Sequence, residues 1–232
     1  MNEVSYTETD VYVRSTGLGS HIMGPWYLNV AKTNLFPNYP ANLAVIYRFP
    51  RDPGTVPVTK SLTGLGRIGM FVDGVSMFDT RDAFSYDTSA GQDDNPMAGG
   101  AVTGDDVWNR DAYVNESVTF DAGNAHQARS HYHYHANPPG LRFALGDSVA
   151  HDPGNNTYTE NFDGGHSPIL GWVRDGYPVY GPYAYSDALD ADSAVTRMRS
   201  GFQKRNITQR QALPAVAARD QGYTAAGSSV DY

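Results

Sequence analysis

The sequence of 232 residues contains no cysteine. Disulfide frameworks, zinc ribbons and thiol catalysis are therefore excluded. The chain also lacks any apolar run close to the roughly 20 residues that a membrane-spanning helix needs. Its opening, MNEVSYTETD, has no apolar centre of the kind that signal peptides carry. An exported form would therefore have lost its signal sequence.

Charge is scarce, and positive charge most of all. Charged residues make up 18% of the chain, which is low for a soluble helical protein. Lys and Arg total 17 against 25 Asp and Glu, for a formal net charge of −8. A field of this sign repels nucleic acid and anionic membranes and attracts cations. We therefore expect no nucleic-acid partner and no membrane span.

Turn-forming and aromatic residues are abundant instead. The chain has 24 Gly, 14 Pro and 16 Tyr, a composition typical of many turns between strands. We predict a mainly β fold in which residues 1–232 form a single β-rich domain. The domain is expected to be sandwich-like or built from irregular sheets, with long loops and two short helices.

Four segments carry the strand pattern. Residues 4–19 alternate and are rich in Val, Thr and Tyr, which predicts a strand or a hairpin. LAVIYRF, residues 43–49, predicts another strand, which Pro50 ends. Asp73-Gly74 and Asp175-Gly176 each stand between apolar runs, and Asp-Gly favours the tight turn of a β-hairpin.

Helix signals are few. One helix is expected within residues 106–118, with Asp105 or Asp106 as its N-cap, and a second from about Ser193. Residues 87–106 hold five Asp and four Gly without apolar periodicity, which predicts a loop. The carboxylates of this acidic loop suit Ca²⁺. They lack the regular spacing of a calcium loop, so a solvated acidic loop is the preferred interpretation.

The segment SHYHYHANPPG, residues 130–140, holds three of the seven histidines. In a strand, His131, His133 and His135 share one face, while Tyr132 and Tyr134 share the other. Neighbours on one face lie roughly 6.5–7 Å apart, so two imidazoles can converge on one metal ion. Imidazole ligands suit Zn, Cu, Ni or Fe. A His/Tyr hydrogen-bond network, an acid–base site and coincidence stay open as alternatives.

A third ligand usually comes from another element. His126 lies just upstream, and His166 opens the second Asp-Gly hairpin, whereas His21 is a weaker candidate. Ligating imidazoles usually donate their second N–H to a carboxylate or a carbonyl. Among the carboxylates near these elements, we predict either Asp121 or Asp175 as such a partner.

Several motifs resemble the YHYH family, whose name describes a Tyr-His-Tyr-His motif. HYHYHANPP and HSPILGWVRDGYPVYGPY carry the resemblance. VDGVSMFDTRDA and WNRDAYVNESVTFDAGNAH extend it, so that it covers roughly residues 11–220. Gly123 stands near a position where this family often has Cys, which puts a thiol or disulfide role in doubt here.

The resemblance implies a set of site residues. It places the metal ligands at His126, His133, His135 and His166, and it moves His131 to the periphery. The groups expected behind these ligands are Asp121, Asp175, Tyr132 and Tyr134. The resemblance also implies export to the periplasm, the cell surface or the medium. Family chains often continue past a segment like VDY, so part of the fold is expected to be missing here or to come from another chain or copy.

Three functions are compatible with this sequence. The first is an exported or cell-surface protein that binds a transition metal, Cu or Zn, through its histidine cluster. The second is a metal-dependent hydrolase or oxidase. The third is a self-assembling surface protein without catalysis. The chain has no G-x-S-x-G elbow, no H-E-x-x-H helix and no P-loop, so no catalytic residue is singled out.

Overall fold

The computed structural model describes residues 3–59, 63–82, 85–87, 92–94, 109 and 111–201. The chain divides into two compact units, Met1–Asp79 with Val118–Arg199 and Thr80–Ser117 with Ser200–Tyr232. The single domain over residues 1–232 stays a prediction. No helix in the described part is long and apolar enough to cross a bilayer.

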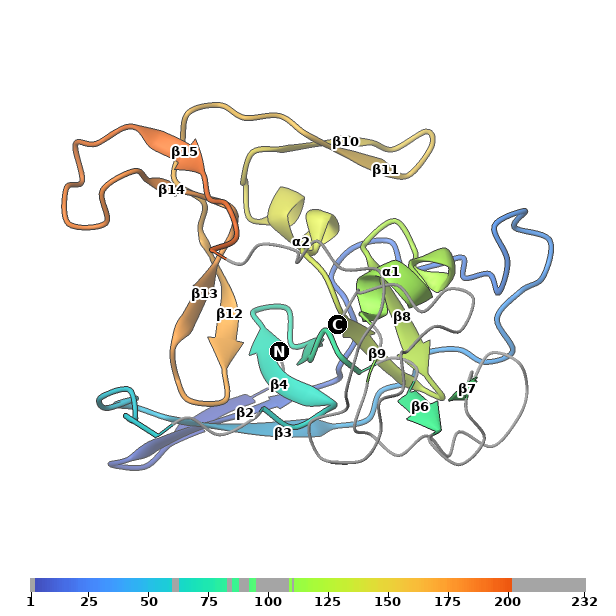
Figure 1. The fold of residues 1–232 in the computed structure, drawn as a ribbon, viewed down its shortest axis with the longest axis horizontal. Coiled ribbons are helices and arrows are strands. Elements are labelled where there is room, and N and C mark those ends of the chain that lie inside the picture. Colours follow the sequence, from blue (N-terminus) through green and yellow to red (C-terminus); the bar gives the residue numbers. More distant parts are fainter. Residues whose placement is uncertain are drawn as a thin grey trace. The chain divides into compact units, whose positions relative to one another are not determined.

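The first unit is built mainly from strands, which confirms the predicted fold class (Figure 1). Its one α-helix in the described residues is α2 (Pro139–Ala144). Its strands are β1 (Glu3–Tyr6), β2 (Asp10–Ser15), β3 (Val45–Pro50), β4 (Arg67–Phe71), β5 (Ser76–Phe78), β8 (Ala125–Ala128), β9 (His131–Tyr134), β10 (Val149–Asp152), β11 (Thr157–Glu160), β12 (Ile169–Val173), β13 (Pro178–Tyr180), β14 (Tyr183–Tyr185) and β15 (Val195–Arg197).

A six-stranded sheet forms the centre of this unit, in the order β13-β12-β4-β5-β9-β8. Strands β5 and β9 run parallel, and the other neighbours are antiparallel. The two Asp-Gly pairs close the β4–β5 and β12–β13 hairpins, as predicted. Gly74 and Gly176 both have φ of 90°, a backbone conformation that glycine adopts without strain.

The N-terminal segment forms the second sheet, in the order β1-β2-β3. The hairpin predicted for residues 4–19 is confirmed as β1–β2, and the next predicted strand is β3. Apolar side chains alternate along β3, where Val45, Tyr47 and Phe49 are buried. They form a core with Met70 of the central sheet, so the two sheets pack on each other (Figure 1).

A second core covers the other face of the central sheet. It contains Tyr132 and Tyr134 of β9 together with Phe71 and Leu170. Met70 and Phe71 are adjacent in β4, so their side chains point into different cores. The sheet is therefore apolar on both faces at β4, whereas on β9 the face opposite Tyr132 and Tyr134 is left for polar side chains.

The first predicted helix is confirmed with a different cap, whereas the second predicted helix is wrong. The first is α1 (Ala112–Glu116), in the second unit, and its N-cap is Asp111 rather than Asp105 or Asp106. The Asp111 side chain accepts a hydrogen bond from the Val114 amide. The segment after Ser193 forms β15, not a helix, in keeping with the β-branched residues Val195 and Thr196.

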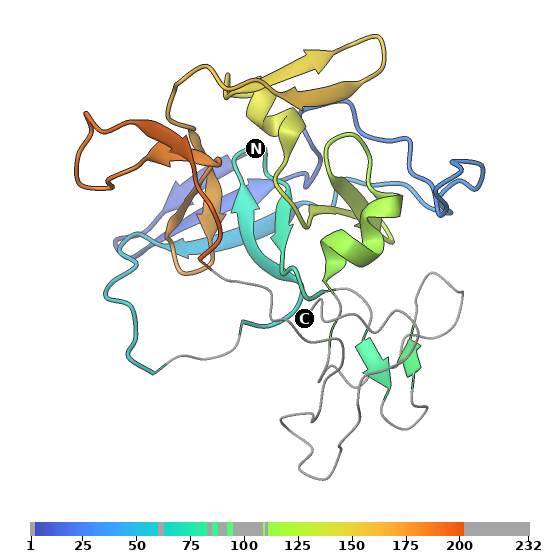
Figure 2. The ribbon, with the colours of Figure 1, turned by 45° about the horizontal axis from the view of Figure 1, so that its top comes forward.

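The second helix of the described residues is α2, which the sequence reading missed. It begins at Pro139, and Pro138 is its N-cap. Proline is common in the first turn of a helix, because the N–H that it lacks has no helical partner there. In Figures 1 and 2, α2 lies beside the β10–β11 hairpin, which it contacts.

The acidic segment 87–106 lies mostly outside the described residues. Its described part corrects the loop prediction, because β6 (Ser85–Asp87) pairs with β7 (Gln92–Asp94). A calcium site in this segment stays a prediction.

Candidate metal centre

The β8–β9 hairpin brings the histidines together. Its register places His126 directly opposite His133. A turn of two residues joins the strands, and Arg129 has φ of 57° in that turn. Paired residues on neighbouring strands point to the same face of the sheet. His135 follows the last residue of β9 and adds a third imidazole on this side.

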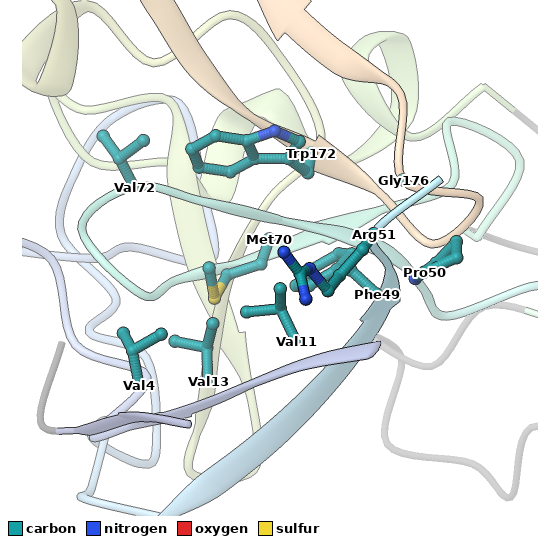
Figure 3. Close-up of a pocket in the computed structure, with 10 residues that line it drawn as sticks. All are labelled: Val4, Val11, Val13, Phe49, Pro50, Arg51, Met70, Val72, Trp172 and Gly176. Carbon is teal, nitrogen blue, oxygen red and sulfur yellow. The ribbon is translucent and has the colours of Figure 1, made fainter. Parts of the chain in front are cut away.

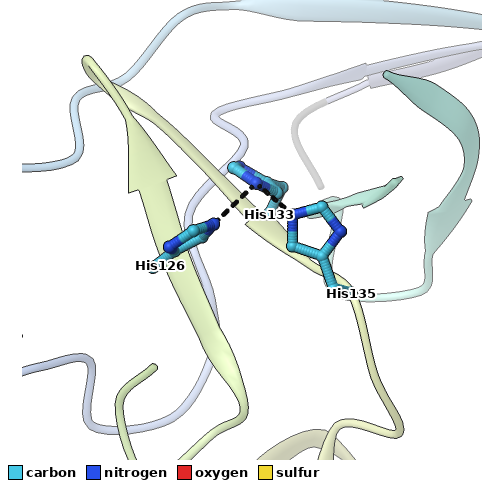
Figure 4. A group of neighbouring side chains, drawn as sticks. All are labelled: His126, His133 and His135. Carbon is cyan, nitrogen blue, oxygen red and sulfur yellow. Dashed lines mark hydrogen bonds between the residues drawn. The ribbon is translucent and has the colours of Figure 1, made fainter. Parts of the chain in front are cut away.

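The three imidazoles converge through their Nε2 atoms (Figure 4). The Nε2 atom of His133 lies 3.1 Å from that of His126 and 3.0 Å from that of His135. One ligand atom from each residue falls within 4.8 Å of the others. The side chains are almost fully buried, since exposed fractions are 4% for His126, 2% for His133 and 5% for His135.

The outward-facing Nδ1 atoms each have a partner of their own. His133 Nδ1 lies 2.8 Å from the backbone carbonyl of His131, and His135 Nδ1 lies 3.2 Å from that of Asp79. A carbonyl can only accept, so both Nδ1 atoms carry the proton. His126 Nδ1 lies 2.7 Å from the Thr119 hydroxyl, which can donate or accept. In their neutral form, the rings of His133 and His135 therefore turn Nε2 lone pairs toward the centre.

Phenylalanine rings surround the imidazoles. Phe78 stacks on His133 with ring centroids 3.9 Å apart, and Phe120 is nearly parallel to His135 at 6.0 Å. Phe36 meets His126 edge-on. Burial lowers the pKa of His133 well below its ordinary value, and the neighbouring His126 and His135 lower it further. The centre is buried among apolar rings and disfavours a proton on His133.

A family model described as YHYH protein matches residues 46–231. The chain belongs to the YHYH protein family. None of the curated proteins and none of the solved structures matches it. The family match contains all three converging histidines and leaves the first 45 residues, among them β1 and β2, outside.

The structure does not bring His166 of this YHYH protein to the cluster. Its Nδ1 lies 2.7 Å from the carbonyl of Ser167, and its ring packs against Tyr180 and Tyr185. The group of converging ligands in the described residues therefore has three members, not the four expected from the resemblance. His166 precedes the β12–β13 hairpin in the sequence, but the fold does not bring its ring to the face of β9 that carries the cluster.

The predicted carboxylates also lie elsewhere. Asp121 accepts hydrogen bonds from the amides of Gly24 and Gly123 and from the Tyr132 hydroxyl, on the tyrosine side of β9. Asp175 is exposed in the β12–β13 turn, where an Asp-Gly turn favours it. Backbone carbonyls and a threonine hydroxyl take the positions behind the ligands that we expected carboxylates to fill.

The remaining residues of the motif separate by face. Tyr132 and Tyr134 are buried in the core on the face opposite the cluster, as alternation predicts. His21 lies between them, with its ring nitrogens 3.0 and 3.2 Å from their hydroxyls, and burial lowers its pKa. His131 contacts the Ser76 hydroxyl through Nε2 and stays outside the converging group.

The sequence does not single out Thr119 and Asp79, the residues that hydrogen-bond to the ligands. Thr119 stands seven residues before His126, a spacing with no known signature, and Asp79 contributes only its backbone carbonyl. Phe78 and Phe120 were present in the quoted motifs without an assigned role. Phe78 precedes His126 by 48 residues, so the sequence gives no sign that its ring stacks on the cluster.

Proposed function

We propose that this YHYH protein binds one transition-metal ion, Zn or Cu, through the Nε2 atoms of His126, His133 and His135. The observation that carries the proposal is the contact between the Nε2 atoms of His133 and His135 at 3.0 Å. Both rings carry their proton on Nδ1, so two lone pairs face each other across this distance. Such a contact is repulsive unless a cation lies between or beside the two atoms.

A metal ion suits this centre better than a proton does. The pKa of His133 is lowered by burial and by both neighbouring histidines, so protonation is disfavoured at neutral pH. Two nitrogens bound tetrahedrally to zinc at 2.0–2.1 Å lie about 3.3 Å apart. The contacts to His133, at 3.1 and 3.0 Å, come close to that separation. Imidazole is a good ligand for both Zn and Cu.

The supporting contacts favour ligation as well. A metal-binding histidine usually donates its second N–H to a fixed acceptor, which sets the orientation of the ring. His133 and His135 do so to the carbonyls of His131 and Asp79. The phenylalanine rings keep water from competing for these atoms.

A second candidate is metal-dependent hydrolysis or oxidation. Three protein ligands are typical of catalytic zinc sites, where a bound metal would activate a water molecule at its fourth position. Against this, the three imidazoles are at most 5% exposed, which leaves little room for a bulky substrate. Burial therefore favours binding over catalysis. Export and the cell-surface location are part of the proposal only through the family resemblance, and self-assembly without catalysis stays a separate alternative.

Metal analysis of untagged protein tests the proposal. After loading with Zn or Cu and removal of excess ion, we expect about one equivalent per chain, since the cluster offers a single set of ligands. His133→Gln is expected to lose most of it, because the central ligand is gone. His166→Gln is the matched control and should retain the metal. Less than about a tenth of an equivalent in the wild type would overturn the proposal.

A further inference from the structure

An apolar cavity of about 430 Å³ lies between the β1-β2-β3 sheet and the β4 and β12 strands of the central sheet (Figure 3). None of the proposed metal ligands lines it. Its floor is formed by Met70, Val13 and Phe49, which are 1%, 5% and 6% exposed. Val11 and Trp172 add to the walls. Pockets of 300–1,000 Å³ with mainly apolar walls are typical sites for small organic ligands.

The cavity continues the core that joins the two sheets. Val13, Phe49 and Met70 belong to that core, and Val11 and Trp172 pack against it. Val4 of β1 also lines the cavity but remains 53% exposed. The walls are therefore made of the same apolar side chains as the core, but no side chain fills the space between them. An apolar ligand would restore the van der Waals contacts that these walls lack.

One cationic side chain, Arg51, lines this apolar space. In Figure 3 its guanidinium extends over the cavity between Phe49 and Met70. One nitrogen, Nη1, donates to the carbonyls of Thr7 and Glu8, at 3.1 and 3.4 Å. These bonds hold the guanidinium in place while its other N–H groups stay available. A fixed guanidinium presents paired N–H donors that match a carboxylate.

Arg51 has no carboxylate partner among the described residues. Arg48, on the same strand, shows the contrast, because Asp10 accepts hydrogen bonds from its Nε and Nη2. The chain as a whole carries eight more negative than positive charges, so an arginine without an acidic neighbour is notable. The guanidinium carbon lies 5.5 Å from the centre of the Tyr6 ring, and no acidic side chain among the described residues competes for its charge.

We propose that this cavity binds a small amphipathic monoanion, a carboxylate with an aliphatic or aromatic body. The carboxylate pairs with Arg51, and the body packs against Met70, Val13 and Trp172. The apolar walls supply affinity by removing hydrocarbon from water, and the single guanidinium selects the charged end. This site is independent of the metal proposal, because the two share no residue.

Binding of decanoate to the untagged, full-length chain tests this inference. Isothermal titration and the intrinsic tryptophan fluorescence, to which Trp172 contributes, should both report saturable binding of one molecule per chain. Decanol, with the same hydrocarbon but no charge, should bind about tenfold more weakly. Arg51→Gln should weaken decanoate by a similar factor and remove its advantage over decanol. Arg174→Gln, which changes another exposed arginine, should leave both affinities unchanged.

A substitution that fills the cavity is the second test. Val11→Phe places a larger side chain in the space and should abolish binding of both probes. Circular dichroism checks its fold, and Arg51→Lys serves if that variant is unfolded. The lysine keeps the charge but loses the paired donors, so decanoate binding should fall between wild type and Arg51→Gln. Absence of saturable binding up to about 1 mM, as expected if another chain segment or copy fills the cavity, would overturn the inference. So would equal affinity in Arg51→Gln.

Discussion

At His133 the strand itself selects the tautomer. The carbonyl that accepts from its Nδ1 belongs to His131, two residues earlier on the same strand. The motif therefore supplies a ligand and the group that orients it within three residues. His131, although outside the converging group, acts through its backbone, and substitution of its side chain leaves that carbonyl in place.

The buried histidines make the metal-free protein sensitive to acid. Burial lowers the pKa of His133, and it also lowers those of His131 and His21. The unfolded chain, with ordinary histidine pKa values near 6.5, then binds more protons than the folded chain as pH falls through that value. The free energy of unfolding therefore keeps its highest value above about pH 6.5. Below that pH it decreases, by up to about 1.4 kcal/mol per pH unit for each such histidine.

Urea unfolding of the metal-free protein at pH 7.5 and 5.5 measures this slope. His133→Gln should reduce the slope by the contribution of one histidine, since glutamine takes up no proton. His166→Gln, outside the cluster, should keep it. A slope unchanged in His133→Gln would contradict the assignment of a neutral, buried imidazole at this position.

Side-chain alternation allowed the sequence to predict this site in part. It placed His133 and His135 on one side and the tyrosines in the core on the other. It could not identify the groups behind the ligands, because a backbone carbonyl such as that of Asp79 belongs to every residue type. His166 shows that position in the sequence does not identify a ligand. It was predicted to bind the metal, but its ring lies against Tyr180 and Tyr185.

At the scale of elements, local turn chemistry was the most informative signal. Both Asp-Gly hairpins formed as predicted, because glycine alone tolerates the φ of 90° found at Gly74 and Gly176. The helix expected after Ser193 was wrong, since β14 offers a pairing partner that the sequence does not reveal. Helix α2 was missed because proline, which stands at its start, is also the residue type that ends strands.

Close contact between β12 and β4 requires glycine. A Cβ added at Gly171 would lie 2.2 Å from the backbone carbonyl oxygen of Met70, which cannot move away alone. We expect Gly171→Ala to lower the free energy of unfolding by about 1–3 kcal/mol, the usual cost of overpacking. Thermal unfolding measures the change.

Gly64→Ala is the matched control for this substitution. A Cβ at Gly64 meets no atom within 4 Å, and its backbone does not adopt positive φ. Its melting temperature should stay within a degree or two of wild type, since exposed substitutions rarely change stability by more than about 0.5 kcal/mol. Equal losses in both variants would show that the β4–β12 contact is not the cause.

At the scale of the molecule, the two faces of the central sheet have different tasks. One face of β9 completes a tyrosine-rich core, and the other presents histidines to a ring of phenylalanines. The parallel pairing of β5 with β9 connects Ser76 with His133 across 57 residues of sequence. No local pattern predicts such a pairing, so the mainly β class could be predicted while the sheet order could not.

The acidic balance of the chain fits a cation at the centre of this arrangement. A formal charge of −8 raises the local concentration of metal ions around the protein. Imidazole ligands add no negative charge, so a bound ion would keep its charge within a buried, aromatic environment. Metal binding at this centre therefore depends on which nitrogen atoms act as ligands.

Anomalous X-ray scattering from crystals of the metal-loaded protein, collected at the Zn and Cu edges, tests that point most directly. The account predicts one strong peak about 2.0–2.1 Å from the Nε2 atoms of His126, His133 and His135 together. A peak bound through His166, or through Nδ1 of any of the three, would contradict it. So would metal-loaded crystals in which the three imidazoles bind no metal.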